Sequence, residues 1–132
     1  MFTILDGTGG DVLAVEITGG YTLQDFEAFK QAFEAQLREG YDKINILCKL
    51  DKLKISQGEW SAFVADGRYA LSHIKQMRHV AVVADSTILE WLVKLDNALF
   101  GNPNEELVEK YFSVNDLDKA WTFVREGSRA AR

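Results

Sequence analysis

The residue whose type and position could most directly do chemistry in this sequence is Ser56. It begins the string Ser56-Gln57-Gly58-Glu59, which is a capping box at the start of an expected helix. A phosphoryl group on the Ser56 hydroxyl would lie against backbone N–H groups at the positive end of that helix. The same spacing makes Ser56 an ordinary N-cap, because its hydroxyl can accept a hydrogen bond from the first helical turn. We therefore expect a helix start here and keep phosphorylation of Ser56 as the alternative.

Three lysines lie just before this serine. Lys49, Lys52 and Lys54 predict a local positive patch, which would attract an acidic headgroup or the acidic surface of a partner. A solvated loop is the alternative interpretation, because lysine side chains are mostly exposed in any globular protein.

The other reactive side chains do not form a catalytic pattern. The two histidines, His73 and His79, lack the spacing of a metal site or of a nucleophile and its base. The single cysteine, Cys48, lies within an apolar run, where a small buried side chain is expected. The glycines of Gly7-Thr8-Gly9-Gly10 join two strands, whereas a phosphate-binding loop joins a strand to a helix. We therefore expect no enzymatic activity, no metal and no cofactor.

The segment 86–100 is expected to form a helix with more apolar surface than a sheet can cover. An amphipathic helix needs an apolar stripe of roughly 100°, and a second apolar strip lies beside that stripe here. The surplus must meet a ligand in a cavity, a second copy of the chain, or a membrane surface. The core stripe contains Ile88, Trp91, Leu92, Leu95 and Leu99, and the second strip contains Leu89, Val93 and Phe100.

Aromatic residues of the preceding helix extend this apolar surface. A hydrophobic ligand held between the two helices would bury several of these side chains, at roughly 1.5–3 kcal/mol for each. The expected apolar walls are Trp60, Phe63, Leu89, Trp91, Val93 and Phe100, with Lys52 and Lys54 facing an acidic headgroup.

An alternation of strands and helices must position these residues. Such alternation predicts an α/β fold with right-handed crossovers, and the first two strands add an antiparallel hairpin. We expect a mixed, largely parallel sheet of about five strands with four helices packed on it. The expected strands are 2–5, 11–17, 43–50, 78–84 and 110–114, and the expected helices are 22–39, 56–74, 86–100 and 115–127.

Length and charge limit the remaining possibilities. The chain has 132 residues and a net charge of −5, which suits one domain and argues against nucleic acid as a partner. No stretch reaches the about 18 apolar residues of a membrane span, and the N-terminus lacks the pattern of a signal peptide. We therefore expect a cytoplasmic protein with a domain over residues 1–127. Gly127 is expected to end the last helix, which leaves 128–132 as a flexible basic tail.

The order of these elements, together with several local strings, resembles the SpoIIAA-like proteins of the STAS superfamily, which are relatives of the anti-sigma factor antagonists. The resemblance extends over nearly the whole chain and includes the last strand at Tyr111-Phe112 and the helix that follows it. The strings are Leu13-Ala14-Val15-Glu16-Ile17-Thr18-Gly19, Ile46-Leu47-Cys48-Lys49-Leu50-Asp51, Arg78-His79-Val80-Ala81-Val82-Val83-Ala84-Asp85 and Leu89-Glu90-Trp91-Leu92.

The resemblance implies a small sheet covered by helices and a protein without enzymatic activity. Members of the superfamily bind protein partners, nucleotides or hydrophobic ligands. The antagonists are switched by phosphorylation of a serine at the start of the helix that follows the third strand. They carry an acidic residue, two small hydroxyl-bearing or similar residues and a glycine there, whereas this chain offers only Ser56-Gln57-Gly58.

Two functions follow as expectations. The first is a cytoplasmic, non-enzymatic binding module for a small hydrophobic ligand of acyl-chain or lipid type, which could associate with a membrane surface. The alternative is a regulatory protein-interaction module of the anti-sigma factor antagonist type. That module would work with or without phosphorylation of Ser56 as a switch, and the helix over 86–100 would be its docking face. A homodimer is one arrangement.

Overall fold

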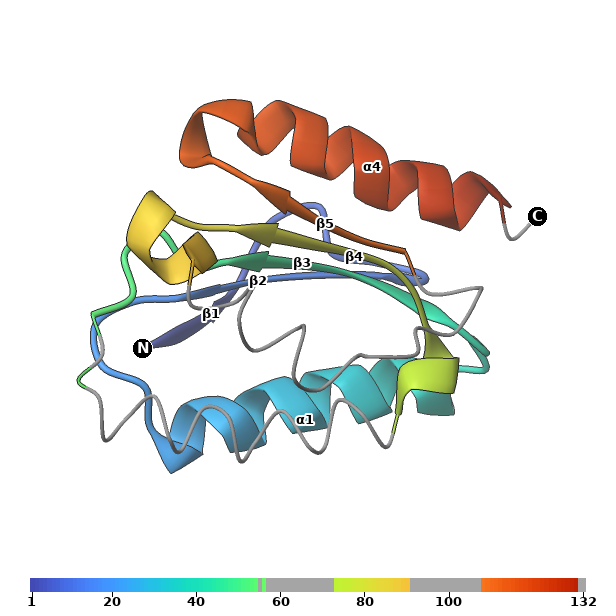
Figure 1. Cartoon of the computed structure of the whole chain (residues 1–132). Coiled ribbons are helices and arrows are strands. Elements are labelled where there is room, and N and C mark those ends of the chain that lie inside the picture. The colour runs from blue at the N-terminus through green and yellow to red at the C-terminus, as the bar shows by residue number, and fades with distance from the viewer. Residues whose placement is uncertain (55, 57–72, 91–107, 131–132) are drawn as a thin grey trace.

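The computed structural model describes residues 1–54, 56, 73–90 and 108–130, and they form a sheet with a helix on each face (Figure 1). The five strands follow one another across the sheet in the order β1-β2-β3-β4-β5. This arrangement confirms the expected α/β fold. The elements are β1 Phe2–Ile4, β2 Val12–Ile17, α1 Leu23–Arg38, β3 Ile44–Lys49, η1 Ile74–Gln76, β4 Met77–Val83, β5 Val108–Phe112, η2 Val114–Asp116 and α4 Leu117–Ala130.

The sheet is mixed, as expected. Strands β1 and β2 are antiparallel, and β2, β3, β4 and β5 are parallel neighbours. The turn between β1 and β2 contains Gly7 and Gly10, whose positive φ angles of 102° and 58° favour glycine. The Thr8 hydroxyl closes this turn, because its Oγ1 accepts a hydrogen bond from Ala14 N at 2.9 Å.

Helix α1 is bounded at both ends by local features of its sequence, close to the expected range 22–39. Thr22 and Asp25 form a capping box, with Asp25 N donating to Thr22 Oγ1 at 3.2 Å and Thr22 N donating to Asp25 Oδ2 at 3.0 Å. The helix ends before Gly40, whose φ of 104° is left-handed. It packs on one face of the sheet, where Phe33 is fully buried against Leu13 and Val15 of β2 and Ile44 and Ile46 of β3.

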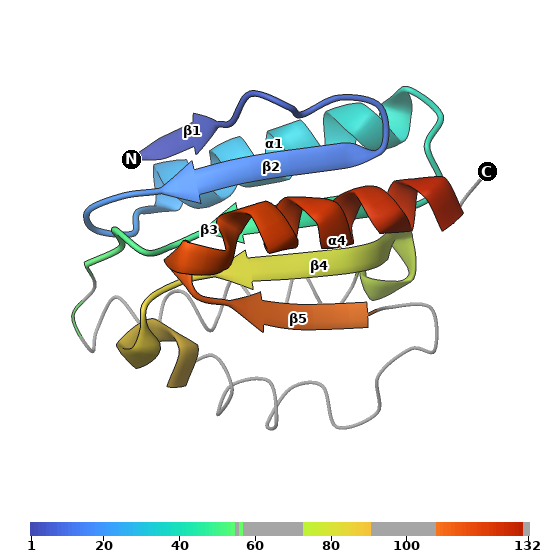
Figure 2. The same ribbon diagram turned by 90° about the horizontal axis from the view of Figure 1, so that it is seen from above.

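Helix α4 packs on the opposite face, over β3 and β4 (Figure 2). The buried side chains of α4 contact the residues of β2, β3 and β4 that point away from α1. These three strands are therefore apolar on both faces. The buried residues on this face are Val12, Ala14, Leu47, Ala81, Val83, Ala120, Phe123 and Val124.

The end of α4 differs from the sequence-based prediction. Gly127 does not end the helix, which continues to Ala130, and residues 128–130 therefore belong to it. Gly127 is buried, and a Cβ atom added to it would lie 2.7 Å from Cγ of His79 and would also collide with the Asn45 side chain. The glycine is needed for close packing of α4 on the sheet. The start of α4 differs as well, because residues 114–116 form η2 and α4 begins at Leu117 rather than at residue 115.

A third helical segment follows β4. Residues 86–90 are helical, and Asp85 caps them by accepting a hydrogen bond from Ile88 N at its Oδ1 atom, at 2.9 Å. The helix expected over 56–74 and the rest of the helix expected over 86–100 fall largely outside the described residues. Within the described part of the chain, no helix is both long and apolar enough to span a bilayer.

We expect Gly127→Ala to lower the free energy of unfolding by up to about 2 kcal/mol, measured by urea denaturation. Alanine is the better helix former by about 1 kcal/mol, but overpacking a well-packed site costs about 1–3 kcal/mol. The control is Gly9→Ala, because an added Cβ at Gly9 meets nothing within 4 Å, and we expect a change within about 0.5 kcal/mol there. A stabilised Gly127→Ala protein would show that α4 does not approach the sheet this closely.

Candidate functional site

The residues of the predicted site that the structure describes, Lys52, Lys54, Ser56 and Leu89, follow the carboxyl ends of β3 and β4, at the edge of the sheet where the parallel strands end (Figure 2). Ligands and partners of open α/β sheets most often bind at this edge. Strand β3 ends here at Lys49 and leads into residues 50–54, which we call the basic segment.

The backbone of the basic segment is held in place by hydrogen bonds. Leu50 N donates to Val83 O at 2.6 Å, Gly19 N donates to Lys52 O at 3.1 Å, and Lys54 N donates to Gly19 O at 2.7 Å. The side chains of Leu50 and Leu53 are buried in the core, whereas Lys52 and Lys54 are exposed. The segment therefore presents two lysines on a fixed backbone.

Lys49 does not join the positive patch that the sequence predicts. Its ammonium group is 2.8 Å from Oε2 of Glu16 and 2.7 Å from Oδ1 of Asp51, and only 13% of its side chain is exposed. Burial alone would lower the pKa of Lys49. The hydrogen bonds and charges of the Asp51 and Glu16 carboxylates outweigh burial and raise that pKa. Lys49 thus stays charged and links the ends of β2 and β3.

Ser56 is exposed, two residues beyond Lys54. Its neighbours at 55 and 57–72 lie outside the described residues, so the capping box remains a prediction. Ser56 therefore follows the two exposed lysines of the basic segment closely in the sequence.

The predicted apolar walls are described at one position only. Leu89 is half-buried and packs against a cluster that contains Leu50, Leu53 and Ile88, so it contributes to the core beside the basic segment. Ile88 is 3% exposed, as the predicted core stripe requires. The other proposed wall residues lie outside the described part of the chain, and the predicted cavity stays a prediction for Trp60, Phe63, Trp91, Val93 and Phe100.

The remaining reactive groups have structural contacts. The ring of His79 stacks on Phe123 with 4.3 Å between centroids, and its Nδ1 lies 2.8 Å from Phe123 O. The ring of His73 meets the edge of Phe33 at 5.9 Å. Burial, together with the Glu109 carboxylate, raises the pKa of the Cys48 thiol to about 12, so this cysteine stays protonated at neutral pH. No cluster of metal-ligating side chains occurs among the described residues.

Two polar residues inside apolar strands have structural roles that the sequence analysis did not predict. Glu16 interrupts β2 and holds Lys49, and Asn45 interrupts β3 with no exposed surface. The signal was present, because a polar side chain within a buried strand needs a partner. The partners themselves come from distant parts of the chain and could not be identified.

Comparison with known proteins agrees with this architecture. The sequence matches the SpoIIAA-like family over residues 12–125. A crystal structure of an uncharacterised protein from Shewanella loihica PV-4, described as having a SpoIIAA-like fold, is similar with a TM-score of 0.64. The two sequences are 22% identical, and the similarity covers 93% of each chain, which shows a shared fold alone. The sequence matches none of the curated proteins with which it was compared.

We expect Lys49→Met to lower the free energy of unfolding by about 1–3 kcal/mol near neutral pH, because it leaves two partly buried carboxylates without a cation. The folded pKa of Lys49 is raised above its ordinary value of 10.5. Its contribution is therefore complete below 10.5 and declines as the pH rises through the higher folded pKa. The measurement is urea denaturation of both proteins from about pH 7 to about pH 11.5.

The control is Lys119→Met, because Lys119 forms an exposed ion pair with Asp116 and should change stability very little. An advantage of the unmodified protein over Lys49→Met that did not decline at all as the pH rises above 10.5 would contradict an electrostatic role for Lys49.

Proposed function

Because the chain belongs to the SpoIIAA-like family, we propose that it is a regulatory binding module that recognises a protein partner at the carboxyl edge of its sheet. The partner would present an acidic surface to Lys52 and Lys54.

The observation that carries this proposal is the basic segment. Its two lysines are exposed, while the backbone between them is hydrogen-bonded to Gly19. The chain as a whole has a net charge of −5, so a fixed positive surface differs from its general electrostatic character. Such a surface favours encounter with an acidic partner, and its backbone is already ordered before binding.

The described groups near this edge support binding more than catalysis. Lys49 is held between two carboxylates, and the Cys48 thiol is protonated at neutral pH. Neither group is suited to act as a nucleophile or general base under these conditions. Leu50, Leu53 and Ile88 instead join the basic segment to the helical residues 86–90, which gives the proposed surface a rigid support.

A photo-crosslinking amino acid at position 54 tests the proposal inside cells. We expect a covalent adduct with a distinct protein, identified by mass spectrometry. The control places the same amino acid at position 129, because Arg129 is exposed in the last turn of α4, at the opposite, amino edge of the sheet. Equal yields of the same adduct from both positions would contradict binding at the carboxyl edge.

The identified partner then allows a quantitative measurement. We expect the double variant Lys52→Glu, Lys54→Glu to weaken binding about tenfold or more, with a smaller dependence of affinity on salt than in the unmodified protein. Arg129→Glu, at the amino edge, is the control and should bind as the unmodified protein does. If native mass spectrometry showed a co-purified hydrophobic molecule and crosslinking gave no protein adduct, the hydrophobic-ligand hypothesis would replace this proposal.

Ser56 provides a further test. Ser56→Ala should lower the free energy of unfolding by about 0.5–2 kcal/mol through loss of an N-cap, whereas Ser56→Asp should be nearly neutral because aspartate also caps well. A negative charge two residues from Lys54 should weaken binding of an acidic partner in Ser56→Asp alone. Affinities that are equal in both variants would show that the basic segment works without a phosphorylation switch.

A further inference from the structure

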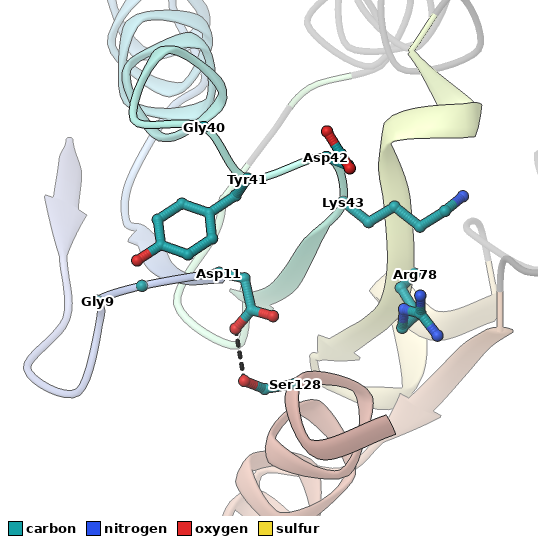
Figure 3. Close-up of a pocket in the computed structure, with 9 residues that line it drawn as sticks. Gly9, Asp11, Gly40, Tyr41, Asp42, Lys43, Arg78 and Ser128 are labelled. Atoms are coloured by element: carbon teal, nitrogen blue, oxygen red, sulfur yellow. Dashed lines mark hydrogen bonds between the residues drawn. The ribbon is translucent and has the colours of Figure 1, made fainter. Parts of the chain in front are cut away.

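A second candidate site lies at the opposite, amino edge of the sheet. A pocket of about 600 Å³ opens where β2, β3 and β4 begin and where α1 and α4 end (Figure 3). This volume is within the range of about 300–1,000 Å³ that is typical of small-molecule sites. The pocket is separate from the basic segment, so it does not depend on the proposed function.

The pocket is lined by two acidic and two basic side chains. Asp11 and Asp42 supply the carboxylates, and Lys43 and Arg78 supply the cations. Lys43 donates a hydrogen bond from Nζ to Lys75 O at 2.9 Å, which holds its ammonium group at the rim. The lining is therefore mixed in charge, and its formal charges cancel.

Arg78 has an unsatisfied donor. Its Nε atom is buried and has no hydrogen-bond acceptor within the described part of the chain. A guanidinium group has five N–H donors, and a buried donor without an acceptor is rare in folded proteins because it is costly. The group that arginine matches best is a carboxylate or phosphate, which can accept two parallel hydrogen bonds.

Asp11 is held on the other side of the pocket. Its Oδ1 atom accepts a hydrogen bond from Ser128 Oγ at 2.5 Å, and its backbone carbonyl accepts one from Asn45 N at 2.7 Å. A carboxylate has further acceptor positions, so Asp11 can also receive a hydrogen bond from an ammonium group. The fixed position of this carboxylate means that little order must be gained on binding.

Tyr41 supplies an aromatic wall beside Asp11 (Figure 3). Its ring lies close to Gly10, where an added Cβ would be 3.6 Å from the phenolic oxygen. Gly10 and Gly40 have positive φ angles of 58° and 104°, so both loops of the pocket turn at residues that favour glycine.

We propose that this pocket binds a small zwitterion, a free α-amino acid, with its carboxylate on Arg78 and its ammonium group on Asp11. A simple anion would meet the carboxylates of Asp11 and Asp42. A simple cation would meet Lys43 and Arg78. A ligand that carries both charges complements both halves of the lining, and the ring of Tyr41 can cover its side chain.

The test is an NMR titration of the ¹⁵N-labelled protein with each L-amino acid, with acetate and with ethylamine. We expect at least one amino acid to give saturable shifts at residues 9–11, 40–43 and 78. Acetate and ethylamine should each bind about tenfold more weakly or worse. Failure of every amino acid to saturate at millimolar concentration would overturn the proposal, as would acetate binding equally well.

Two variants address the two charges separately. Arg78→Gln and Asp11→Asn should each weaken amino-acid binding about tenfold or more, and Asp11→Asn keeps an oxygen that can accept from Ser128. Lys119→Gln, in the first turn of α4 at the opposite edge, should bind as the unmodified protein does. Circular dichroism melts establish that each variant is folded. Unchanged affinity in the folded variant of either pocket residue would overturn the proposal.

Discussion

The buried amide of Asn45 is the interaction on which the amino edge of the sheet and the position of α4 depend. Its Nδ2 donates to Asp11 O at 3.2 Å, and its Oδ1 accepts from His79 N at 3.1 Å, so one side chain joins β2, β3 and β4. The register between β3 and β4 shifts at this residue, between Ile44 and Ile46. The Asn45 Oδ1 therefore accepts from the His79 N–H, a donor that the irregular ladder between β3 and β4 would leave buried without an acceptor. Only a glycine at position 127 leaves room for α4 to cover the Asn45 amide.

The two edges of the sheet are held by different polar contacts. At the amino edge, Asn45 donates hydrogen bonds to the backbone carbonyl of Asp11, and the end of α4 brings Ser128 to the Asp11 carboxylate. At the carboxyl edge, Lys49 joins β2 and β3 through Glu16 and Asp51, and these three charges are paired with one another. Lys52 and Lys54 are exposed, and they are the cations that the proposed partner would meet. Membership of the SpoIIAA-like family accounts for the shared scaffold, and the sites on it carry the function.

Local chemistry was sufficient to predict most of the scaffold. The capping box of Thr22 and Asp25, the left-handed Gly40 and the Asp85 cap all act within a few residues of the chain. Continuous apolar runs identified β3 and β4 because parallel strands are buried on both faces. The order of these elements then indicated a mixed sheet. At the candidate site, only the exposure of Lys52 and Lys54 followed from their type and sequence position.

The amino-acid sequence by itself thus determined the strands, both ends of α1, the start of the helical residues 86–90 and the mixed sheet, because each depends on short-range hydrogen bonding and on the period of apolar residues. Only the tertiary structure decided how particular polar groups are used. The sequence predicts Lys49 as part of a positive patch, but its ammonium group is paired with the carboxylates of Glu16 and Asp51. The sequence predicts Gly127 as a helix end, but it lies within α4 and packs against the sheet. Arg78 and Asp11 meet at one pocket although they lie far apart in the chain. These roles depend on which distant residue supplies the partner, and the spacing of residues along a chain does not contain that information.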